Sequence, residues 1–280
     1  MTTIETSLID FSEERSEWDG PHTIADCKRA LSPSSIQGIS YALNPYGGCS
    51  HGCVYCYAPG YTHSDPSRWR VVQVRRNIAD RLARELPSTD GTIGVGTVTD
   101  PYQPAESRFL LTRRCLDILA SRERHAIVYT KSDLVLRDRE MLRGMGASVG
   151  ITVTSADDRT SKITEPGAPL PSARFRALEE LVSAGVDTYA LVSPVMSTLS
   201  GHEEELADAI SKTGVCRVFV SSLDLRHTDS DRLGRMRIGQ DRDAELRLIS
   251  AGRALGLDVR RFRDRHPDVL RRLLGSVPRM

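Results

Sequence analysis

The sequence predicts an α/β protein built on a curved parallel sheet. From about residue 39 onward, short apolar runs rich in β-branched residues alternate with segments of helical character. The run Ile93–Val98 is almost continuously apolar, as expected for a strand that is buried on both faces of a parallel sheet. Six strand–helix units joined by right-handed crossovers would give either a partial barrel or a doubly wound sheet.

The predicted strands and helices alternate in regular order. The strands are Ile39–Leu43, Thr92–Thr99, Ala126–Lys131, Ser148–Thr154, Thr188–Val195 and Arg217–Leu223. The helices are Val71–Leu86, Thr112–Arg122, Leu136–Met145, Ser172–Ala184, Glu203–Lys212 and Asp241–Leu255. Ser172 can cap a helix start, and Gly185 follows the end of the same helix. We expect one core domain over residues 39–256, with an N-terminal extension (1–38) and a short C-terminal tail (257–280).

Composition narrows the class of protein. A formal net charge of +1 over 280 residues provides no overall field that would attract nucleic acid or an anionic membrane. The Arg-rich stretch Arg226–Arg279 is interpreted as a solvated surface rather than a phosphate-binding one. No apolar run approaches the roughly 20 residues that span a bilayer, and Met1–Ser16 lacks the layout of a signal peptide. We therefore expect a cytoplasmic protein, in which clustered cysteines indicate metal binding or catalysis before disulfides.

The segment Asn44–Ala58, with the sequence NPYGGCSHGCVYCYA, carries the chemistry. It follows the first predicted strand, and active-site loops gather at the carboxyl ends of parallel strands. Cys49, Cys53 and Cys56 have the spacing C-x3-C-x2-C, on a loop whose glycines permit tight bends. Three such thiolates can bind three irons of a 4Fe–4S cluster, which leaves the fourth iron open to a small molecule.

Two other metal sites were weighed against this open cluster. A structural zinc site closes with four ligands, and His51, which lies between two of the cysteines, is poorly placed to complete a tetrahedron. An electron-transfer cluster would require a fourth cysteine, but Cys27, Cys115 and Cys216 are isolated in the sequence. The open cluster is therefore the favoured interpretation.

The cysteine motif, with the aromatic Tyr55 before its third cysteine, resembles the signature of the radical S-adenosylmethionine (radical SAM) superfamily. The wider segment is similar to the spore photoproduct lyase-like branch, and the likeness extends over roughly residues 27–225. The further segments that carry it are Gly96–Glu106, Leu111–Arg114, Thr130–Asp133 and Glu165–Pro166.

The resemblance implies a partial (βα)6 barrel of the radical SAM type, with SAM at its carboxyl face. It further implies an enzyme in which one-electron reduction of the cluster cleaves SAM to methionine and a 5′-deoxyadenosyl radical. That radical would abstract hydrogen from a small molecule, a peptide or a nucleic acid. A flavodoxin or ferredoxin is the implied reductant, and no membrane partner is expected.

Candidate cofactor-binding residues lie on the cysteine loop and at the ends of successive strands. Thr97, Thr99 and Asp100, at the end of the second strand, are placed to bind the SAM amine or the substrate, although Asp-Pro sequences also form simple turns. The lysine is placed to meet the SAM carboxylate, a role that the resemblance suggests. The fourth-strand threonines could bind the ribose or the carboxylate, although threonine is also an ordinary β-former. These candidates are Tyr55, Thr97, Thr99, Asp100, Lys131, Thr152 and Thr154.

Two alternative functions follow from the same motif. Characterised DNA-repair members of the branch return a hydrogen atom from a cysteine three residues before the second-strand aspartate, where this chain has Thr97. An O–H bond is too strong to replace that thiol, and the near-neutral charge also argues against a DNA photoproduct lyase. The second alternative is a non-catalytic iron–sulfur carrier or a zinc-binding module.

Overall fold

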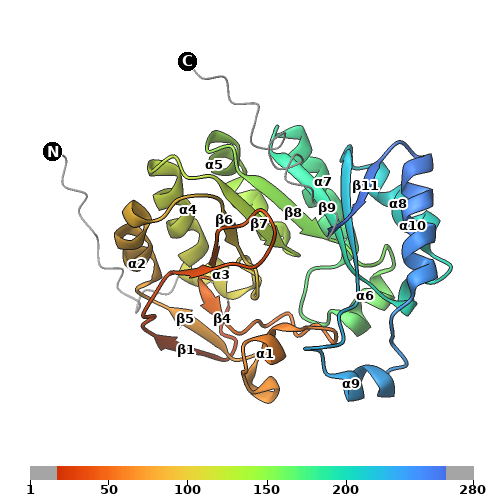
Figure 1. Ribbon diagram of the computed structural model, residues 1–280, viewed down its shortest axis with the longest axis horizontal. Coiled ribbons are helices and arrows are strands. Elements are labelled where there is room, and N and C mark those ends of the chain that lie inside the picture. The colour runs from red at the N-terminus through yellow and green to blue at the C-terminus, as the bar shows by residue number, and fades with distance from the viewer. Residues whose placement is uncertain (1–17, 263–280) are drawn as a thin grey trace.

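The structure is a computed structural model that describes residues 18–262 (Figure 1). Its large sheet confirms the α/β class, because its six central strands run parallel and follow one another in chain order. These strands confirm the six predicted ones, with slightly different ends. They are β3 (Tyr41–Leu43), β6 (Ile93–Val95), β7 (Ala126–Thr130), β8 (Ser148–Thr152), β9 (Asp187–Val195) and β10 (Arg217–Ser222).

Two further strands extend the large sheet at its edges. β11 (Asp258–Arg261) pairs in parallel with β10, and β2 (Leu31–Pro33) pairs antiparallel with β3. β2 belongs to the predicted N-terminal extension and β11 to the predicted C-terminal tail. Both segments therefore contribute main-chain hydrogen bonds to the core sheet.

A second sheet has three strands, which come from before and after β3, the first parallel strand of the large sheet, in the chain. It consists of β1 (His22–Ala25), β5 (Val72–Arg75) and β4 (Tyr46–Gly47), in that spatial order. The predicted helix Val71–Leu86 is wrong at its start, because its first residues form β5. Its valines are fully buried while Gln73 between them is exposed, which is the two-residue period of a strand.

The longer helices lie along the outer side of the curved sheet (Figure 1). Five predicted helices are confirmed in whole or in part: α2 (Ile78–Glu85), α4 (Leu111–Ser121), α7 (Pro171–Ser183), α8 (Glu203–Ser211) and α10 (Arg242–Ala254). The predicted helix at 136–145 is a 3-10 helix, η3 (Asp133–Asp138), followed by α5 (Arg139–Gly144). None of the helices in residues 18–262 is long and apolar enough to cross a membrane.

Several short elements were not predicted because their apolar patterns are too brief to show a period. They are α1 (Ala58–Tyr61), α3 (Ala105–Phe109), α6 (Asp158–Thr164), α9 (Ser230–Arg235), η1 (Pro66–Arg68), η2 (Leu86–Ser88) and η4 (Ser197–Leu199).

A buried carboxylate ties the start of α4 to the small sheet. Glu106 accepts hydrogen bonds from Tyr46 Oη (2.5 Å) and from the amides of Thr112 (2.8 Å) and Arg113 (3.1 Å). Arg137 Nη2 completes the set at 2.8 Å. Burial raises the pKa of Glu106, and the hydrogen bonds from these donors oppose that shift. The carboxylate satisfies two helix-start amides that have no partner within α4 itself.

Replacing Glu106 by alanine should lower the free energy of unfolding by about 2–4 kcal/mol, because buried donors lose their acceptor. Urea denaturation followed by circular dichroism measures this change. The matched control is Glu179→Ala, an exposed position on α7, where the change should stay within about 0.5 kcal/mol. Equal stabilities of the two variants would contradict the role assigned to Glu106.

Candidate active site

The cysteine loop, Asn44–Tyr57, follows β3 at the carboxyl edge of the large sheet, as predicted. Its three thiols are free, with Cys49 buried and the other two half-buried. Cys49 and Cys56 pack in one apolar cluster with Trp69. Cys53 packs against a second cluster that includes Tyr55. The loop therefore holds its thiols away from bulk water between two apolar layers.

One side of the cysteine loop is fixed by backbone contacts and by one glutamine. The Cys49 amide donates to Trp69 O (2.9 Å). Gly48 has φ +69°, and a Cβ atom there would lie 2.6 Å from the same Trp69 oxygen. Gln103 is fully buried, donates to Gly48 O (3.1 Å) and accepts from the Ser50 amide (3.0 Å). Only glycine fits at position 48, and Gln103 fixes the turn on both sides of Cys49.

The other side of the cysteine loop is held by the end of α6 and the residues after it. The Val54 amide donates to Thr164 O (2.9 Å), and the Gly167 amide donates to His51 O (2.8 Å). A Cβ atom at Gly167 would collide with Ser50 O. The loop is thus enclosed by segments that come from three distant parts of the chain.

The donor set fits an iron–sulfur cluster. His51 Nε2 and Trp69 Nε1 are the buried side-chain nitrogens without a hydrogen-bond partner in residues 18–262, and both lie beside the cysteines. Buried polar atoms of this kind require a partner. Among the described residues, no three His, Cys, Asp or Glu side chains converge as the ligands of a single ion do. The thiolates of a 4Fe–4S cluster bind different irons and need not converge on one point.

Burial also sets the protonation of the thiols. It raises the pKa of Cys49 and Cys56, and it raises the pKa of Cys53 to about 12. The positive charge of Lys131 opposes this shift at Cys53 and Cys56. Because cysteines bind metals as thiolates, loading of a cluster must release these protons.

A buried charge network lies next to Cys53. Glu165 and Arg174 are both completely buried and form an ion pair of 2.5 Å. Glu165 also accepts hydrogen bonds from Tyr55 Oη and from Thr154 Oγ1 (3.2 Å). Burial would raise the pKa of Glu165, but the charges of Arg174 and Lys131 hold it below its usual value. Lys131 Nζ lies 5.6 Å from the centre of the Tyr55 ring, a cation–π arrangement.

Asp100 makes its contacts within the protein. Its carboxylate accepts hydrogen bonds from Thr130 Oγ1 (2.7 Å), from the Lys131 amide (2.7 Å) and from the Tyr102 amide (2.9 Å). His51 Nδ1 lies 3.5 Å from the same carboxylate. Asp100 therefore joins the ends of β6 and β7 to the cysteine loop.

The two threonines before Asp100 also contact the cysteine loop. Thr97 Oγ1 accepts from Asn44 Nδ2 (3.1 Å), and Thr97 O accepts from Tyr57 Oη (2.6 Å). Thr99 is buried and donates to Tyr46 O (3.1 Å). The structure thus brings Thr97, Thr99 and Asp100 together at the base of the loop.

Sequence reasoning missed three residues that shape this site. Gln103 and Glu165 stand in segments that the resemblance covers, but neither was assigned a role there. Arg174 lies within a helix, and no local pattern marks it. Its guanidinium also donates to the carbonyl oxygen of Thr152 (3.2 Å), so that the predicted Thr152 borders the same charge network.

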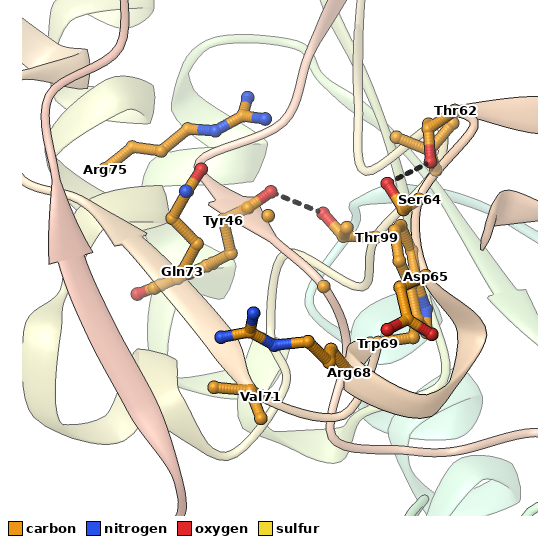
Figure 2. A pocket seen from close by; sticks show the side chains of 13 residues that line it. Tyr46, Thr62, Ser64, Asp65, Arg68, Trp69, Val71, Gln73, Arg75 and Thr99 are labelled. Carbon is orange, nitrogen blue, oxygen red and sulfur yellow. Dashed lines mark hydrogen bonds between the residues drawn. The ribbon is translucent and has the colours of Figure 1, made fainter.

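A cavity of about 350 Å³ lies behind the cysteine loop. Arg68 and Arg75 reach into it from two sides, as Figure 2 shows. Gly47, Gly48 and Trp69 form part of its wall, so the cavity reaches the residue next to Cys49. Thr99 is the predicted cofactor-binding residue that lines it.

Comparison with known proteins identifies the family. The family model for the radical SAM superfamily matches residues 43–210. An uncharacterized protein of Methanocaldococcus jannaschii is 34% identical over 177 residues, which are 61% of this chain and 66% of that protein. An uncharacterized protein of Mycobacterium tuberculosis is 33% identical over 218 residues, or 71% of this chain and 64% of that protein. The chain thus spans slightly less than two thirds of these relatives.

Solved structures show the same fold. Spore photoproduct lyase complexed with dinucleoside spore photoproduct has a TM-score of 0.62 at 15% identity, over 85% of this chain and 81% of that one. Native anSMEcpe with bound AdoMet has a TM-score of 0.51 at 11% identity, over 78% of this chain and 63% of that one. The partial-barrel fold class that the sequence suggests is therefore confirmed.

The indole of Trp69 provides a test of the cluster site. Its N–H makes no hydrogen bond of normal geometry in the described residues, yet it lies near enough to the Cys56 thiol to lower that group's pKa. Because N–H donors to sulfur raise the potential of a cluster, Trp69→Phe should lower it. We expect a fall of about 30 mV, roughly a threefold change in equilibrium constant for one electron.

An EPR redox titration of the iron-loaded protein measures that potential. The matched control is Trp18→Phe, because Trp18 packs on Phe109 and His22 rather than on the cysteines. An unchanged potential in Trp69→Phe, or an equal fall in Trp18→Phe, would show that the indole does not act on the cluster.

Proposed function

Because this chain belongs to the radical SAM superfamily, we propose that it is an enzyme that reductively cleaves SAM and abstracts a hydrogen atom from its substrate. The observation that carries the proposal is the enclosed loop with three free thiols, Cys49, Cys53 and Cys56, at the carboxyl edge of the sheet. When bound there, a 4Fe–4S cluster supplies the electron that converts SAM to methionine and a 5′-deoxyadenosyl radical.

The first task of the chain is to hold the three thiols in place. Gln103 and Gly167 secure opposite sides of the loop by hydrogen bonds to its backbone. Asp100 joins the loop through His51 to the ends of two strands. In this proposal Asp100 acts as a positioning residue, and so does Thr99.

The second task is to bind SAM beside the cluster. Lys131 has no carboxylate of the described residues within 4.0 Å. Burial acts to lower its pKa, but Glu165 and Asp100 are near enough to oppose that effect, and the pKa is raised. A half-buried cation of this kind suits the carboxylate of SAM. Thr97 and Thr152 are proposed to contribute hydroxyl groups to SAM or substrate, while Thr154 orients Glu165.

The third task is to exclude water from a reactive radical. Tyr55 packs with Val54, Met196, Leu233 and other apolar residues beside Cys53. Its ring is proposed to shield the cluster and the adenine of SAM, while its hydroxyl group remains bonded to Glu165. The same apolar layer, which includes Leu233 of α9, packs against the Cys53 thiol.

The decisive experiment is anaerobic reconstitution with iron and sulfide, followed by dithionite, SAM and quantification of 5′-deoxyadenosine. Alanine at Cys49, Cys53 or Cys56 should abolish the product, because each thiolate would hold one iron. Cys216→Ala is the matched control and should retain the product, since Cys216 is exposed and lies outside the loop.

The outcomes separate the classes of function. A fully loaded wild-type cluster that yields no 5′-deoxyadenosine, and whose EPR spectrum SAM leaves unchanged, would indicate an iron–sulfur carrier instead. Stoichiometric zinc without iron would indicate a structural module. Either result would overturn the proposal.

Replacing Lys131 by methionine tests the SAM site. The loss of a charge-assisted hydrogen bond should weaken SAM binding roughly 10-fold or more, measured by calorimetry on the iron-loaded protein. Lys162→Met on α6 is the matched control, because Lys162 is exposed. If Lys131→Met retains its full iron content and binds SAM with unchanged affinity, the role proposed for Lys131 is wrong.

A further inference from the structure

A short surface segment, Pro66–Val71, covers one side of the cysteine loop. Trp69 contacts Cys49 through the backbone hydrogen bond of 2.9 Å. Arg70 lies over Gly52, since a Cβ atom on that glycine would be 2.9 Å from Arg70 Nε. The exposed Arg68 is therefore connected to Cys49 through one residue, Trp69, and one backbone hydrogen bond.

The segment carries more positive than negative charge. Arg68 and Arg70 are exposed, and neither forms an ion pair with a carboxylate of the described residues. Arg75 is also free of such a pair and donates to Asn44 O (2.9 Å). Among the described residues, Asp65 is the one acidic residue of the cavity wall; it accepts hydrogen bonds from the amide (2.9 Å) and hydroxyl group (2.8 Å) of Ser67, and its single negative charge offsets only part of the charge of the three arginines.

The cavity next to this segment has two arginines and one aspartate in its wall. Figure 2 shows the guanidinium groups of Arg68 and Arg75 facing the same space, with Gln73 beside them. The backbone of Gly47 and Gly48 forms its inner wall. A carboxylate seated between the two arginines would therefore lie next to the residue that precedes Cys49.

We propose that the face formed by Arg68, Arg70, Arg75 and this cavity is the docking site of an acidic one-electron carrier protein. The inference rests on the proposed function, which requires an electron to reach the cluster. The reduced carrier loses one electron and the cluster gains one, with no covalent bond made or broken at the interface. Opposite charges on the two partners steer the encounter and fix its orientation.

A second group of arginines, on α9, offers a matched comparison. Arg232 and Arg235 on α9 are exposed and form no ion pair in the described part of the chain. Leu233 of the same helix packs against Val54 and Tyr55. The α9 face therefore meets the cysteine loop through apolar side chains, whereas Pro66–Val71 meets it through a backbone hydrogen bond.

The test compares Arg68→Glu/Arg70→Glu with Arg232→Glu/Arg235→Glu in the full, iron-loaded chain. Stopped-flow absorbance measures the rate at which reduced flavodoxin, an acidic flavoprotein, reduces the cluster. At low ionic strength the first variant should be at least about 10-fold slower than wild type, and the α9 variant should match wild type. Salt should slow the wild-type reaction and leave the first variant nearly unchanged.

Dithionite separates this inference from the function on which it rests. After complete chemical reduction, 5′-deoxyadenosine formation should be equal in wild type and in both variants. If product formation is equal in all three proteins, but charge reversal on α9 rather than on Pro66–Val71 slows cluster reduction by flavodoxin, the proposed docking site is wrong and the proposed enzymatic function still holds. If inorganic phosphate binds saturably and neither charge reversal changes the rate of reduction by flavodoxin, the cavity is a small-anion site and the docking proposal is wrong. Absence of product in wild type would overturn the proposed function itself.

Discussion

The hydrogen bond from the Cys49 amide to Trp69 O is the contact on which the site depends, because it fixes how deeply the cysteine loop lies in the protein. It forms only where the backbone at Gly48 adopts a left-handed conformation and no Cβ atom meets the Trp69 carbonyl. Gln103 then satisfies the carbonyl group of Gly48 and the amide of Ser50, which the turn would otherwise bury without partners. The small sheet, whose strand β5 follows Trp69, thereby becomes part of the site.

Charge balance explains why so many ionisable groups surround this loop. Lys131 and Arg174 carry two positive charges, and the carboxylates of Glu165 and Asp100 supply two negative charges. Burial keeps the free thiols neutral, so Lys131 gains a thiolate neighbour only when metal binds and protons leave. Thiolates and the SAM carboxylate would each bring negative charge to Lys131. A half-buried lysine costs least where such ligands complete its surroundings.

The sequence predicts most of the framework because buried parallel strands have a strong local signature. The β-branched runs locate all six central strands, and the cysteine spacing locates the loop. The sequence-based prediction fails at Val72–Arg75. Two buried valines, two residues apart, form too short a strand pattern to be distinguished from the longer helical pattern of α2 that follows. The ion pair of Glu165 with Arg174 is equally invisible, because it depends on how α7 lies against the loop after α6. Asp100 illustrates the intermediate case: its position is predictable, but its four neighbours come from tertiary structure.

The likeness to spore photoproduct lyase is a likeness of fold, and the residue at position 97 differs from what that resemblance implies. The resemblance to that branch implies a hydrogen-returning thiol at the position of Thr97, whose hydroxyl group here accepts a hydrogen bond from Asn44. The cysteines outside the metal motif do not replace it. Cys115 is buried in α4, Cys216 precedes β10 at the opposite edge of the sheet, and Cys27 contacts Asn77 before α2. None of these thiols, all within the described residues, contacts Thr97 or Asn44, so a substrate radical formed by the proposed enzyme would have no thiol donor at that position.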